Sequence, residues 1–537
     1  MKALSVLFGG RLSPEAFEKV FPSNGAGKES AFSLSLHAAS MFSGTQKIVF
    51  LGMEGENYPL PPEIELCSRP FWNKKNLMEE LSRLSGGEFH IYFAWADSPL
   101  LDPELAAKMA ERHIRYGAEY SYADGWPYGF APEILSPGTA GILAKIAETD
   151  ESAVERDALF QLIQKDINSF DIETEISPVD LRPWRLSMTA DSKRNLLLLS
   201  RFLEAGFSSS KDAENFISQK PELLRTLPAF FNIQVSGACP QACTLCPWPL
   251  YGLDKNGAAV TDRNDYMPKE AFSSLLDKIV DFAGDAVIDI SLWGEIALHP
   301  EKMELIEMVL SRPALSLIIE TSGIGWKTQE LETLAKAALT ALPRLNNMAP
   351  LSWIVSLDAH DSLRYREVRG PGFSEAHSCA RTLLSLFPKD LYVQAVRVKG
   401  QEDDIENFYR SWKAESPSLE GKHIIIQKYN DFAGVMPKLK ASDLSPVKRR
   451  SCWHIKRDFY ILLDGRVPCC REDLAALKNS SVMGNALEEE LSLIWERGMA
   501  LYQKHCKLEG MTGDDMLNEN FFSGICDNCD EYYTFNF

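Results

Sequence analysis

The stretch FFNIQVSGACPQACTLC, from Phe230 to Cys246, decides the fold of the middle of this chain. It begins with an apolar run that is typical of a buried strand. The loop that follows carries thiols at Cys239, Cys243 and Cys246. Three thiolates on one short loop can hold three corners of a four-iron cluster, whereas a closed electron-transfer cluster takes four cysteines. The loop therefore predicts a cluster whose fourth iron is open to another ligand.

A zinc site and a disulfide framework are both less consistent with this loop than an iron–sulfur cluster is. Structural zinc usually takes four ligands from paired half-sites, but the next cysteine, Cys379, lies far along the chain. Disulfide frameworks are typical of small secreted chains. This chain has 537 residues, enough to bury several cores without cross-links. The spacing therefore favours an iron–sulfur cluster.

The spacing Cys-x3-Cys-x2-Cys after a strand resembles the signature of the radical SAM enzymes, with Leu245 where many members carry an aromatic residue. The resemblance implies that S-adenosylmethionine (SAM) binds at the open iron of a [4Fe-4S] cluster. Reductive cleavage would then give methionine and a 5′-deoxyadenosyl radical that abstracts a hydrogen atom from the substrate. The protein would supply orientation and exclude water.

Composition limits the partners of the chain. The net charge of −19 opposes binding to phosphate backbones, so we expect no nucleic-acid partner. No run of 18 apolar residues suggests a membrane-spanning helix. The N-terminal segment Met1 to Phe8 has a short apolar core without a cleavage site and is better explained as a buried strand. Cluster chemistry requires reduced thiols, which predicts a cytoplasmic protein.

Downstream of the cysteine loop, apolar runs alternate with amphipathic stretches, which indicates βα units around a parallel sheet. Strands are predicted at Ala286 to Trp293, Leu315 to Glu320, Trp353 to Leu357, Leu391 to Val398 and His423 to Gln427. Together with the first strand they make six units of a partial (β/α)6 barrel. Functional residues are expected at the C-terminal ends of the strands.

Several strand ends resemble the SAM-binding segments of the radical SAM enzymes. Trp293-Gly294-Glu295 resembles their Gly-Gly-Glu segment, with Trp293 in place of the first glycine. The resemblance implies that this segment holds the amino group of SAM. It also implies contacts with the ribose and carboxylate of SAM from the other strand ends. The expected SAM-binding residues are Gly294, Glu295, Ser322, Ser356, Asp358 and Arg369.

A second group of cysteines runs from Cys452 to Cys529 and resembles a SPASM domain, the extension that holds auxiliary iron–sulfur clusters in many radical SAM enzymes. The ligands expected for an auxiliary [4Fe-4S] cluster are Cys452, Cys470, Cys526 and Cys529. Cys470 is preferred to Cys469 because the family places this ligand five positions after a glycine, here Gly465. Cys506 remains a further candidate, and a zinc ribbon remains the alternative for the whole group.

The first 207 residues resemble cytidylyltransferase-like nucleotidyltransferases of Rossmann-like fold. Strands are predicted near Leu4 to Phe8, Lys47 to Gly52 and His90 to Ala94. The resemblance implies that Asp97 binds Mg2+ and that Asp191 offers a second carboxylate. The triphosphate-binding turn is reduced to Gly9-Gly10-Arg11, with Lys28 much later. We therefore expect weak nucleotide binding with little or no transfer.

The order of these parts resembles the proteins called spiro-SPASM. The predicted domains are a nucleotidyltransferase-like domain (1–207), a linker (208–228), a radical SAM barrel (229–437) and a SPASM domain (438–537). The resemblance implies an oxidoreductase or maturase that acts on a peptide, a protein or a nucleotide-linked small molecule, with flavodoxin or ferredoxin as electron donor. The alternative is a zinc-stabilised, non-catalytic binding protein with a nucleotide-binding first domain.

Overall fold

The computed structural model describes residues 1–537 except residues 11, 23–26, 208, 252–258, 416–422, 443–444, 447–448, 478–481, 508–524 and 535–537. Its contacts divide the chain into two units, Met1–Leu224 and Arg225–Phe537. Arg11 of the predicted triphosphate turn lies outside the described residues. Within the described ranges, none of the helices combines the length and apolar character needed to cross a membrane.

The first unit is built around a seven-stranded sheet in the order β5-β4-β1-β6-β8-β7-β9. The three predicted strands are confirmed as β1 (Ala3–Phe8), β4 (Thr45–Met53) and β6 (His90–Trp95), all parallel. The other strands are β5 (Glu65–Arg69), β7 (Tyr120–Asp124), β8 (Glu133–Leu135) and β9 (Ile172–Ile176), with β8 antiparallel to both of its neighbours. A hairpin of β2 (Val20–Pro22) and β3 (Lys28–Ser30) stands apart from this sheet.

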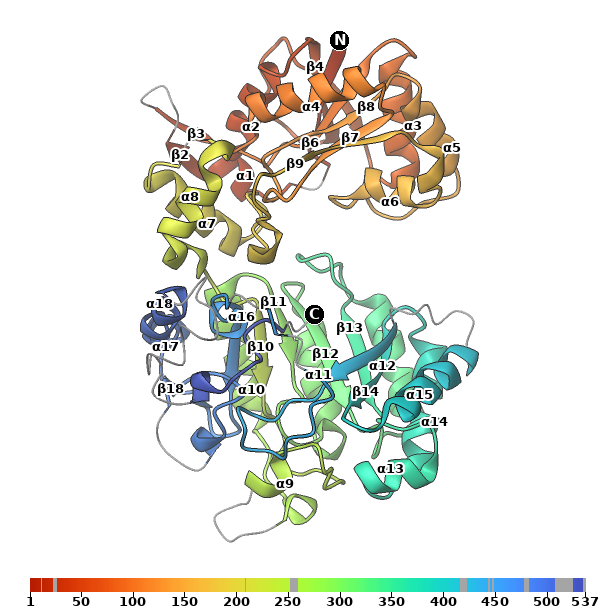
Figure 1. The fold of residues 1–537 in the computed structure, drawn as a ribbon, viewed down its shortest axis with the longest axis vertical. Helices are drawn as coiled ribbons and strands as arrows, with labels where there is room; N and C mark the ends of the chain where they lie inside the picture. Colours follow the sequence, from red (N-terminus) through yellow and green to blue (C-terminus); the bar gives the residue numbers. More distant parts are fainter. Residues whose placement is uncertain are drawn as a thin grey trace. The chain divides into compact units, whose positions relative to one another are not determined.

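Helices pack on both faces of the first sheet, where two separate apolar clusters form (Figure 1). They are α1 (Glu15–Glu18), α2 (Ala31–Ser40), α3 (Lys74–Ser85), α4 (Pro103–Tyr116), α5 (Thr139–Ile146), α6 (Ala158–Gln164), α7 (Lys193–Glu204) and α8 (Ala213–Gln219). Helix α8 lies inside the segment predicted as a linker. Phe216 of α8 packs against Phe202 and Phe207 at ring-centroid distances of 4.9 and 5.3 Å, which joins α8 to the first unit.

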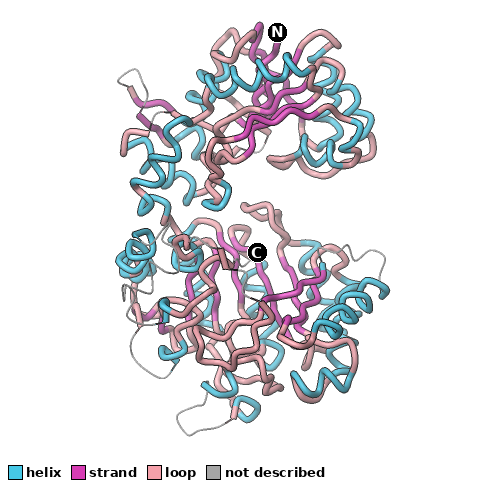
Figure 2. Tube along the Cα trace, in the orientation of Figure 1, coloured by secondary structure: helices cyan, strands magenta, loops and turns pink. Residues whose placement is uncertain are grey.

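The second unit contains a seven-stranded sheet in which every strand pair is parallel, in the order β15-β14-β13-β12-β11-β10-β16 (Figure 2). Six strands match the predicted ones: β10 (Phe230–Ile233), β11 (Ala286–Asp289), β12 (Leu315–Thr321), β13 (Leu351–Ser356), β14 (Leu391–Arg397) and β15 (Ile424–Lys428). The seventh, β16 (Asp458–Ile461), comes from the C-terminal region and pairs with β10. A short hairpin of β17 (Arg466–Val467) and β18 (Gly484–Asn485) follows it.

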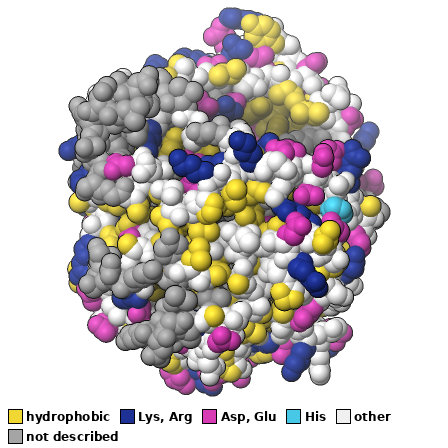
Figure 3. Space-filling view, turned by 60° about the horizontal axis from the view of Figure 1, so that its bottom comes forward, with side chains coloured by type: hydrophobic (Ala, Val, Ile, Leu, Met, Phe, Trp, Pro, Cys, Tyr) yellow, Lys and Arg dark blue, Asp and Glu magenta, His cyan; other side chains and the backbone are white. Residues whose placement is uncertain are grey.

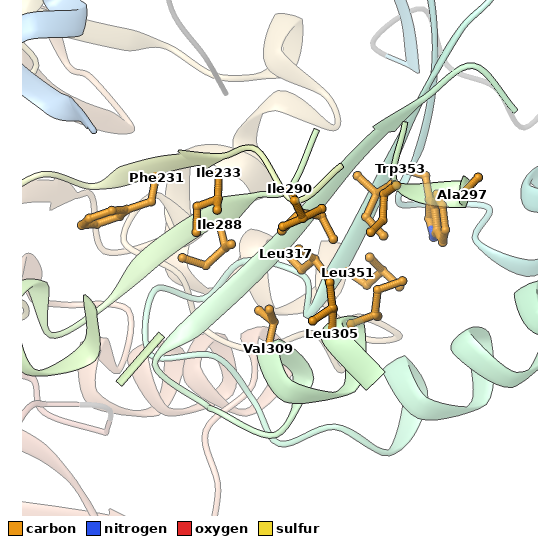
Figure 4. Packing of buried hydrophobic residues seen from close by; sticks show 14 of the residues in the cluster. Phe231, Ile233, Ile288, Ile290, Ala297, Leu305, Val309, Leu317, Leu351 and Trp353 are labelled. Carbon is orange, nitrogen blue, oxygen red and sulfur yellow. The ribbon is translucent and has the colours of Figure 1, made fainter. Parts of the chain in front are cut away.

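The helices of the second unit are α9 (Trp248–Tyr251), α10 (Lys269–Ala283), α11 (Lys302–Leu310), α12 (Thr328–Thr340), α13 (Ser362–Val368), α14 (Phe373–Leu386), α15 (Glu402–Glu415), α16 (Trp453–Arg457), α17 (Leu491–Arg497) and α18 (Met499–Lys507). Since successive side chains of a strand point to opposite faces, each strand has an outer face toward helices and an inner face. The outer face is apolar, and Figure 4 shows Ile288, Leu317 and Trp353 of the strands beside Leu305 and Val309 of α11 (Figure 4).

The inner face changes character along the strands. Toward their N-terminal ends it is an apolar layer that includes Phe230, Val287, Ile318 and Ile354. Two residues further along each strand it becomes polar, in a layer that we call the polar ring. The polar ring consists of Asn232, Asp289, Glu320, Ser356, Gln394 and Gln427. Since all six line one cavity, the sheet curves around that cavity.

Candidate functional site

A cavity of about 240 Å³ lies on the inner face of the second sheet, at the C-terminal ends of its strands. Its lining contains the three cysteines of the loop after β10 and all six predicted SAM-binding residues: Cys239, Cys243, Cys246, Gly294, Glu295, Ser322, Ser356, Asp358 and Arg369. Figure 3, in which the α9 end is turned forward, shows hydrophobic side chains across the middle of the molecular surface in view, between acidic and basic ones. The structure thus brings together residues that are far apart in the sequence.

The cysteine loop is fixed to α13 and to the segment that follows it. Thr244 donates from its backbone nitrogen and from its hydroxyl to the carbonyl oxygen of Val368, at 2.9 and 3.2 Å. The Gln241 amide donates to the Tyr365 hydroxyl and to the Pro371 carbonyl oxygen, both at 3.0 Å. These contacts fix the position of the loop whose three thiols line one end of the cavity.

The Trp293-Gly294-Glu295 segment begins with two consecutive residues in left-handed backbone conformations. Trp293 has a φ of +49° and Gly294 a φ of +98°. A left-handed conformation at a bulky residue costs on the order of 1–3 kcal/mol and is found where function requires it. A Cβ atom at Gly294 would lie 2.1 Å from the Ser236 carbonyl oxygen, so only glycine fits there. Trp293 therefore holds a left-handed conformation that glycine adopts more readily.

The Glu295 carboxylate is buried and joins two strand ends. It accepts hydrogen bonds from the Ser322 backbone nitrogen and hydroxyl, both at 2.7 Å, and from the Thr321 hydroxyl at 2.8 Å. Burial raises the pKa of Glu295. The Glu295 backbone nitrogen donates to Ala238, immediately before the first cysteine, at 2.8 Å. Glu295 thus positions the cysteine loop relative to β12.

Asp358 and Arg369 form an ion pair at the same end of the cavity. Arg369 Nη1 lies 2.6 Å from Asp358 Oδ2, and Arg369 Nε donates to Gln241 Oε1 at 3.2 Å. Asp358 has a φ of +60°, and its other oxygen accepts from the Val396 backbone nitrogen at 2.8 Å. The guanidinium is therefore held in a fixed orientation beside the thiols.

The chemistry of these thiols fits an iron–sulfur cluster. Burial, with a contribution from Glu295, raises the pKa of Cys239 to about 12, and burial also raises the pKa of Cys243 and Cys246. Such thiols become thiolates only when a cation compensates the charge. Among the described residues no three candidate ligands converge on a single ion. A four-iron cluster instead takes one thiolate at each of several separate irons.

A second, smaller cavity is lined by the four cysteines predicted for the auxiliary cluster, Cys452, Cys470, Cys526 and Cys529. Other residues around it are Arg449, His454, Tyr460, Arg471, Glu472 and His505. Burial raises the pKa of Cys452 and of Cys526 to about 12. Four thiols around one cavity are the donors of a closed four-iron cluster and equally of a zinc site, so the donor set alone fits both.

The other cysteines lie elsewhere. Cys469, adjacent to Cys470, lines a different cavity, and its Sγ lies 3.7 Å from Asp473 Oδ2. Cys506 lies on α18 and packs against the group of buried apolar side chains that includes Cys452 and Tyr532. It does not line the second cavity. Cys379 is buried in the outer core, and Cys67 is partly buried in the first unit. Cys470 thus lines the second cavity and Cys469 does not, although the Cys469 thiol is close enough to Cys526 to contribute to the raised pKa of that residue.

Asp97 and Asp191 of the first unit meet on the guanidinium of Arg156. Asp97 is 1% exposed. Its carboxylate accepts hydrogen bonds from Arg156 Nη1 at 3.1 Å and from Arg156 Nη2 at 2.6 Å. Arg156 Nη2 also lies 2.8 Å from Asp191 Oδ2, and the guanidinium lies over the Trp95 ring, 4.5 Å from its centroid. Asp102, and not Asp97, caps the following helix α4.

This arrangement does not fit the Mg2+ that the sequence led us to expect at Asp97. Mg2+ requires oxygen ligands at about 2.0–2.1 Å and several waters in octahedral geometry. Here the positive charge between the two carboxylates is supplied by the chain itself. Arg156 has no recognisable motif around it, so this contact could not be predicted from local sequence.

Removing the guanidinium is expected to create a divalent-cation site. In the full-length protein, Arg156→Ala should bind one Mn2+ more than wild type, because Asp97 and Asp191 then face each other without a cation. Mn2+ titration followed by EPR measures this, with Arg156→Gln as a second variant of smaller structural effect. Arg182→Ala, which removes the partner of Asp124 and Asp180, is the matched control. Asp97-dependent Mn2+ binding by wild type would contradict this assignment.

Sequence reasoning missed five features of the second unit. Strand β16 was not predicted, nor were Arg471, which lines both cavities, and His505. Asp289 and Glu320 of the polar ring were also missed. Asp289 and Glu320 could have been found from the sequence, because each is a carboxylate near the C-terminal end of an otherwise apolar strand.

Comparison with known proteins gives one extensive relative. The chain is 34% identical over 389 residues to an uncharacterized protein of Treponema pallidum (strain Nichols), covering 71% of this chain and 98% of that protein. A second uncharacterized protein of the same organism is 36% identical over 58 residues, which cover 11% of this chain and 26% of that protein. No family model matches the chain.

Solved structures show only distant likeness. The radical SAM enzyme SuiB of Streptococcus suis, bound to precursor peptide SuiA, is 15% identical with a TM-score of 0.41, covering 68% of this chain and 85% of that chain. The radical SAM enzyme BtrN, in complex with AdoMet and 2-DOIA, is 16% identical with a TM-score of 0.32, covering 52% and 88%. A cytidylyltransferase of Leptospira borgpetersenii is 14% identical with a TM-score of 0.34, covering 41% and 95%.

These TM-scores lie below 0.5, so the chemistry of the chain has to be argued from its own residues. The extensive sequence relative is different, because the match spans almost all of that protein. By this relationship, the chain belongs to the same protein family as the uncharacterized protein of Treponema pallidum.

Proposed function

We propose that this protein is a radical SAM enzyme of the oxidoreductase or maturase type, built on a partial (β/α)6 barrel with a SPASM extension. One observation supports the proposal above all others. Cys239, Cys243 and Cys246 line one end of a cavity whose described lining contains no other cysteine. A cluster held by three thiolates keeps an iron open, and the adjoining cavity offers space for a ligand of that iron.

Cys239, Cys243 and Cys246 would hold the cluster, and the strand ends around the cavity would hold SAM. When bound, these groups supply a reductively generated 5′-deoxyadenosyl radical that abstracts a hydrogen atom. The chain contributes position and charge. Trp293 and Gly294 line the cavity, and the Asp358–Arg369 pair fixes a carboxylate and a guanidinium in it.

The second cavity supports an auxiliary [4Fe-4S] cluster on Cys452, Cys470, Cys526 and Cys529. Arg471 lines both cavities, so the two proposed clusters have a shared neighbour. An auxiliary cluster in this place would accept the electron left by an oxidised substrate or contact the substrate directly. A reduced flavodoxin or ferredoxin is the proposed electron donor, the cytoplasm is the proposed location, and a peptide, protein or nucleotide-linked molecule is the proposed substrate.

The proposal is tested by incubating the anaerobically reconstituted, reduced protein with SAM and quantifying 5′-deoxyadenosine. We expect slow formation without any substrate, because SAM reaches the open iron whether or not a substrate is present. Metal analysis of the same preparation separates the alternative. Iron with sulfide agrees with the proposal, whereas zinc without sulfide and without SAM cleavage would show a zinc-stabilised binding protein.

A further inference from the structure

The floor of the larger cavity carries an arrangement of charges that the SAM-binding residues do not explain. The polar ring lies directly above an apolar layer, and both are built from the same six strands. A polar layer inside a curved sheet is costly unless its groups find partners. The hydrogen bonds that the polar-ring side chains make, and the donors and acceptors that stay unused, therefore indicate what the floor of the cavity binds.

The two carboxylates of the floor come from neighbouring strands. Asp289 ends β11 and Glu320 lies near the end of β12, on the same face. Glu320 Oε1 accepts from the Ser356 hydroxyl at 2.7 Å and from the Gln394 amide at 2.8 Å. Asp289 Oδ1 accepts from the Ser291 backbone nitrogen at 2.9 Å. These bonds orient each carboxylate and engage one oxygen of each.

The electrostatic state of this pair favours a second positive charge beside that of Arg471, which lines the same cavity and already acts to lower the pKa of Asp289. Burial, followed by the neighbouring Glu320 carboxylate, raises the pKa of Asp289 to about 7. Glu320 is exposed to the cavity, and its carboxylate is close enough to that of Asp289 to repel it. A positively charged group placed between them removes that repulsion and gains charge-assisted hydrogen bonds.

Two donors near these carboxylates are unused. Asn232 lies beside Asp289 in the sheet register and is 5% exposed, and its Nδ2 has no hydrogen-bond partner among the described residues. The Nε of Arg471 lies 3.6 Å from Glu472 Oε1 and likewise has no hydrogen-bond partner in the described part of the chain. A buried amide donor without a partner is destabilising, because it loses its hydrogen bonds to water and gains none in return. Both donors require an oxygen acceptor.

We propose that the substrate carries a protonated amine close to an oxygen acceptor, with the amine held by Asp289 and Glu320 and the oxygen by Asn232 and Arg471. This inference rests on the proposed radical SAM function, because it assigns the floor of the same cavity to the substrate. Amino sugars and lysine side chains next to peptide carbonyl groups both present this chemistry.

The test is calorimetric titration of the reconstituted, oxidised full-length protein in the presence of SAM, so that binding is measured without turnover. Two matched pairs of probes are used. Glucosamine is compared with glucose, and a lysine-containing tripeptide is compared with its Nε-acetylated form. We expect at least one amine to bind about tenfold or more tightly than its neutral partner. A change in affinity of about tenfold is what one charge-assisted hydrogen bond contributes. The pair that shows the difference identifies the source of the amine.

Three variants locate the binding. Asp289→Asn and Glu320→Gln each preserve side-chain shape and should weaken binding of the amine about tenfold. Glu332→Gln, at an exposed position of α12, is the matched control and should bind like wild type. The inference is wrong if neither amine binds, if neutral probes bind equally well, or if both floor variants leave the affinity unchanged. SAM cleavage is measured in the same wild-type preparation. If SAM is cleaved but no amine binds, this inference fails while the proposed function stands.

Discussion

The triple variant Cys239→Ala, Cys243→Ala, Cys246→Ala should retain about half of the iron of the wild-type protein, about four of about eight atoms. The two groups of cysteines line two different cavities, so loss of one group leaves the donors of the other in place. The same variant should form no 5′-deoxyadenosine, because the lost cluster is the one with the open iron. Iron and sulfide analysis after anaerobic reconstitution measures the first effect, and chromatography of the SAM reaction measures the second.

The control for this variant is Cys379→Ala. Cys379 is buried in the outer core of the same unit and lies outside both cavities. It should keep full iron content and full SAM cleavage, although the smaller side chain lowers stability. If the triple variant kept all of its iron, the loop cysteines would not be cluster ligands.

Replacing Cys470 by serine should remove the auxiliary cluster, whereas the same change at Cys469 should leave it intact. Cys470 lines the cavity of Cys452, Cys526 and Cys529, and Cys469 does not. A closed cluster needs four thiolates, so the loss of one gives an unstable or incomplete cluster. The expected difference is about four iron atoms between two variants that differ by one position.

This pair of variants provides its own control, because both replace a sulfur by an oxygen at adjacent residues. Cleavage of SAM without substrate should persist in both, since the loop cluster is untouched. Equal iron contents in the two variants would show that the choice of Cys470 is wrong. A larger loss in Cys469→Ser would assign the ligand to Cys469.

The parts of the fold that could be predicted are those determined by local patterns. Strands β10 to β15 are short apolar runs with helical segments between them, and the structure confirms their order and parallel pairing. Parallel neighbours place their C-terminal ends at one edge. From that rule alone, Glu295, Ser322 and Asp358 are expected near the cysteine loop. All three line one cavity with it.

The remaining features depend on contacts between distant segments. Strand β16 has only four residues, and it becomes a strand by pairing with β10, far earlier in the chain. The contact of Arg156 with Asp97 and Asp191 joins three separate loops that share no motif. The assignment of α8 to the first unit depends on the packing of three phenylalanine rings. No periodicity within a segment reveals such pairings.

Binding of SAM to an iron of the loop cluster is the step on which the proposed function depends, and EPR spectroscopy observes it directly. The protein is reduced anaerobically, in the Cys470→Ser variant so that the loop cluster dominates the spectrum, and frozen with and without SAM. We expect SAM to shift the g-values of the cluster signal, because it becomes a ligand of one iron. A cluster signal that is identical with and without SAM would show that no iron of the loop cluster binds it.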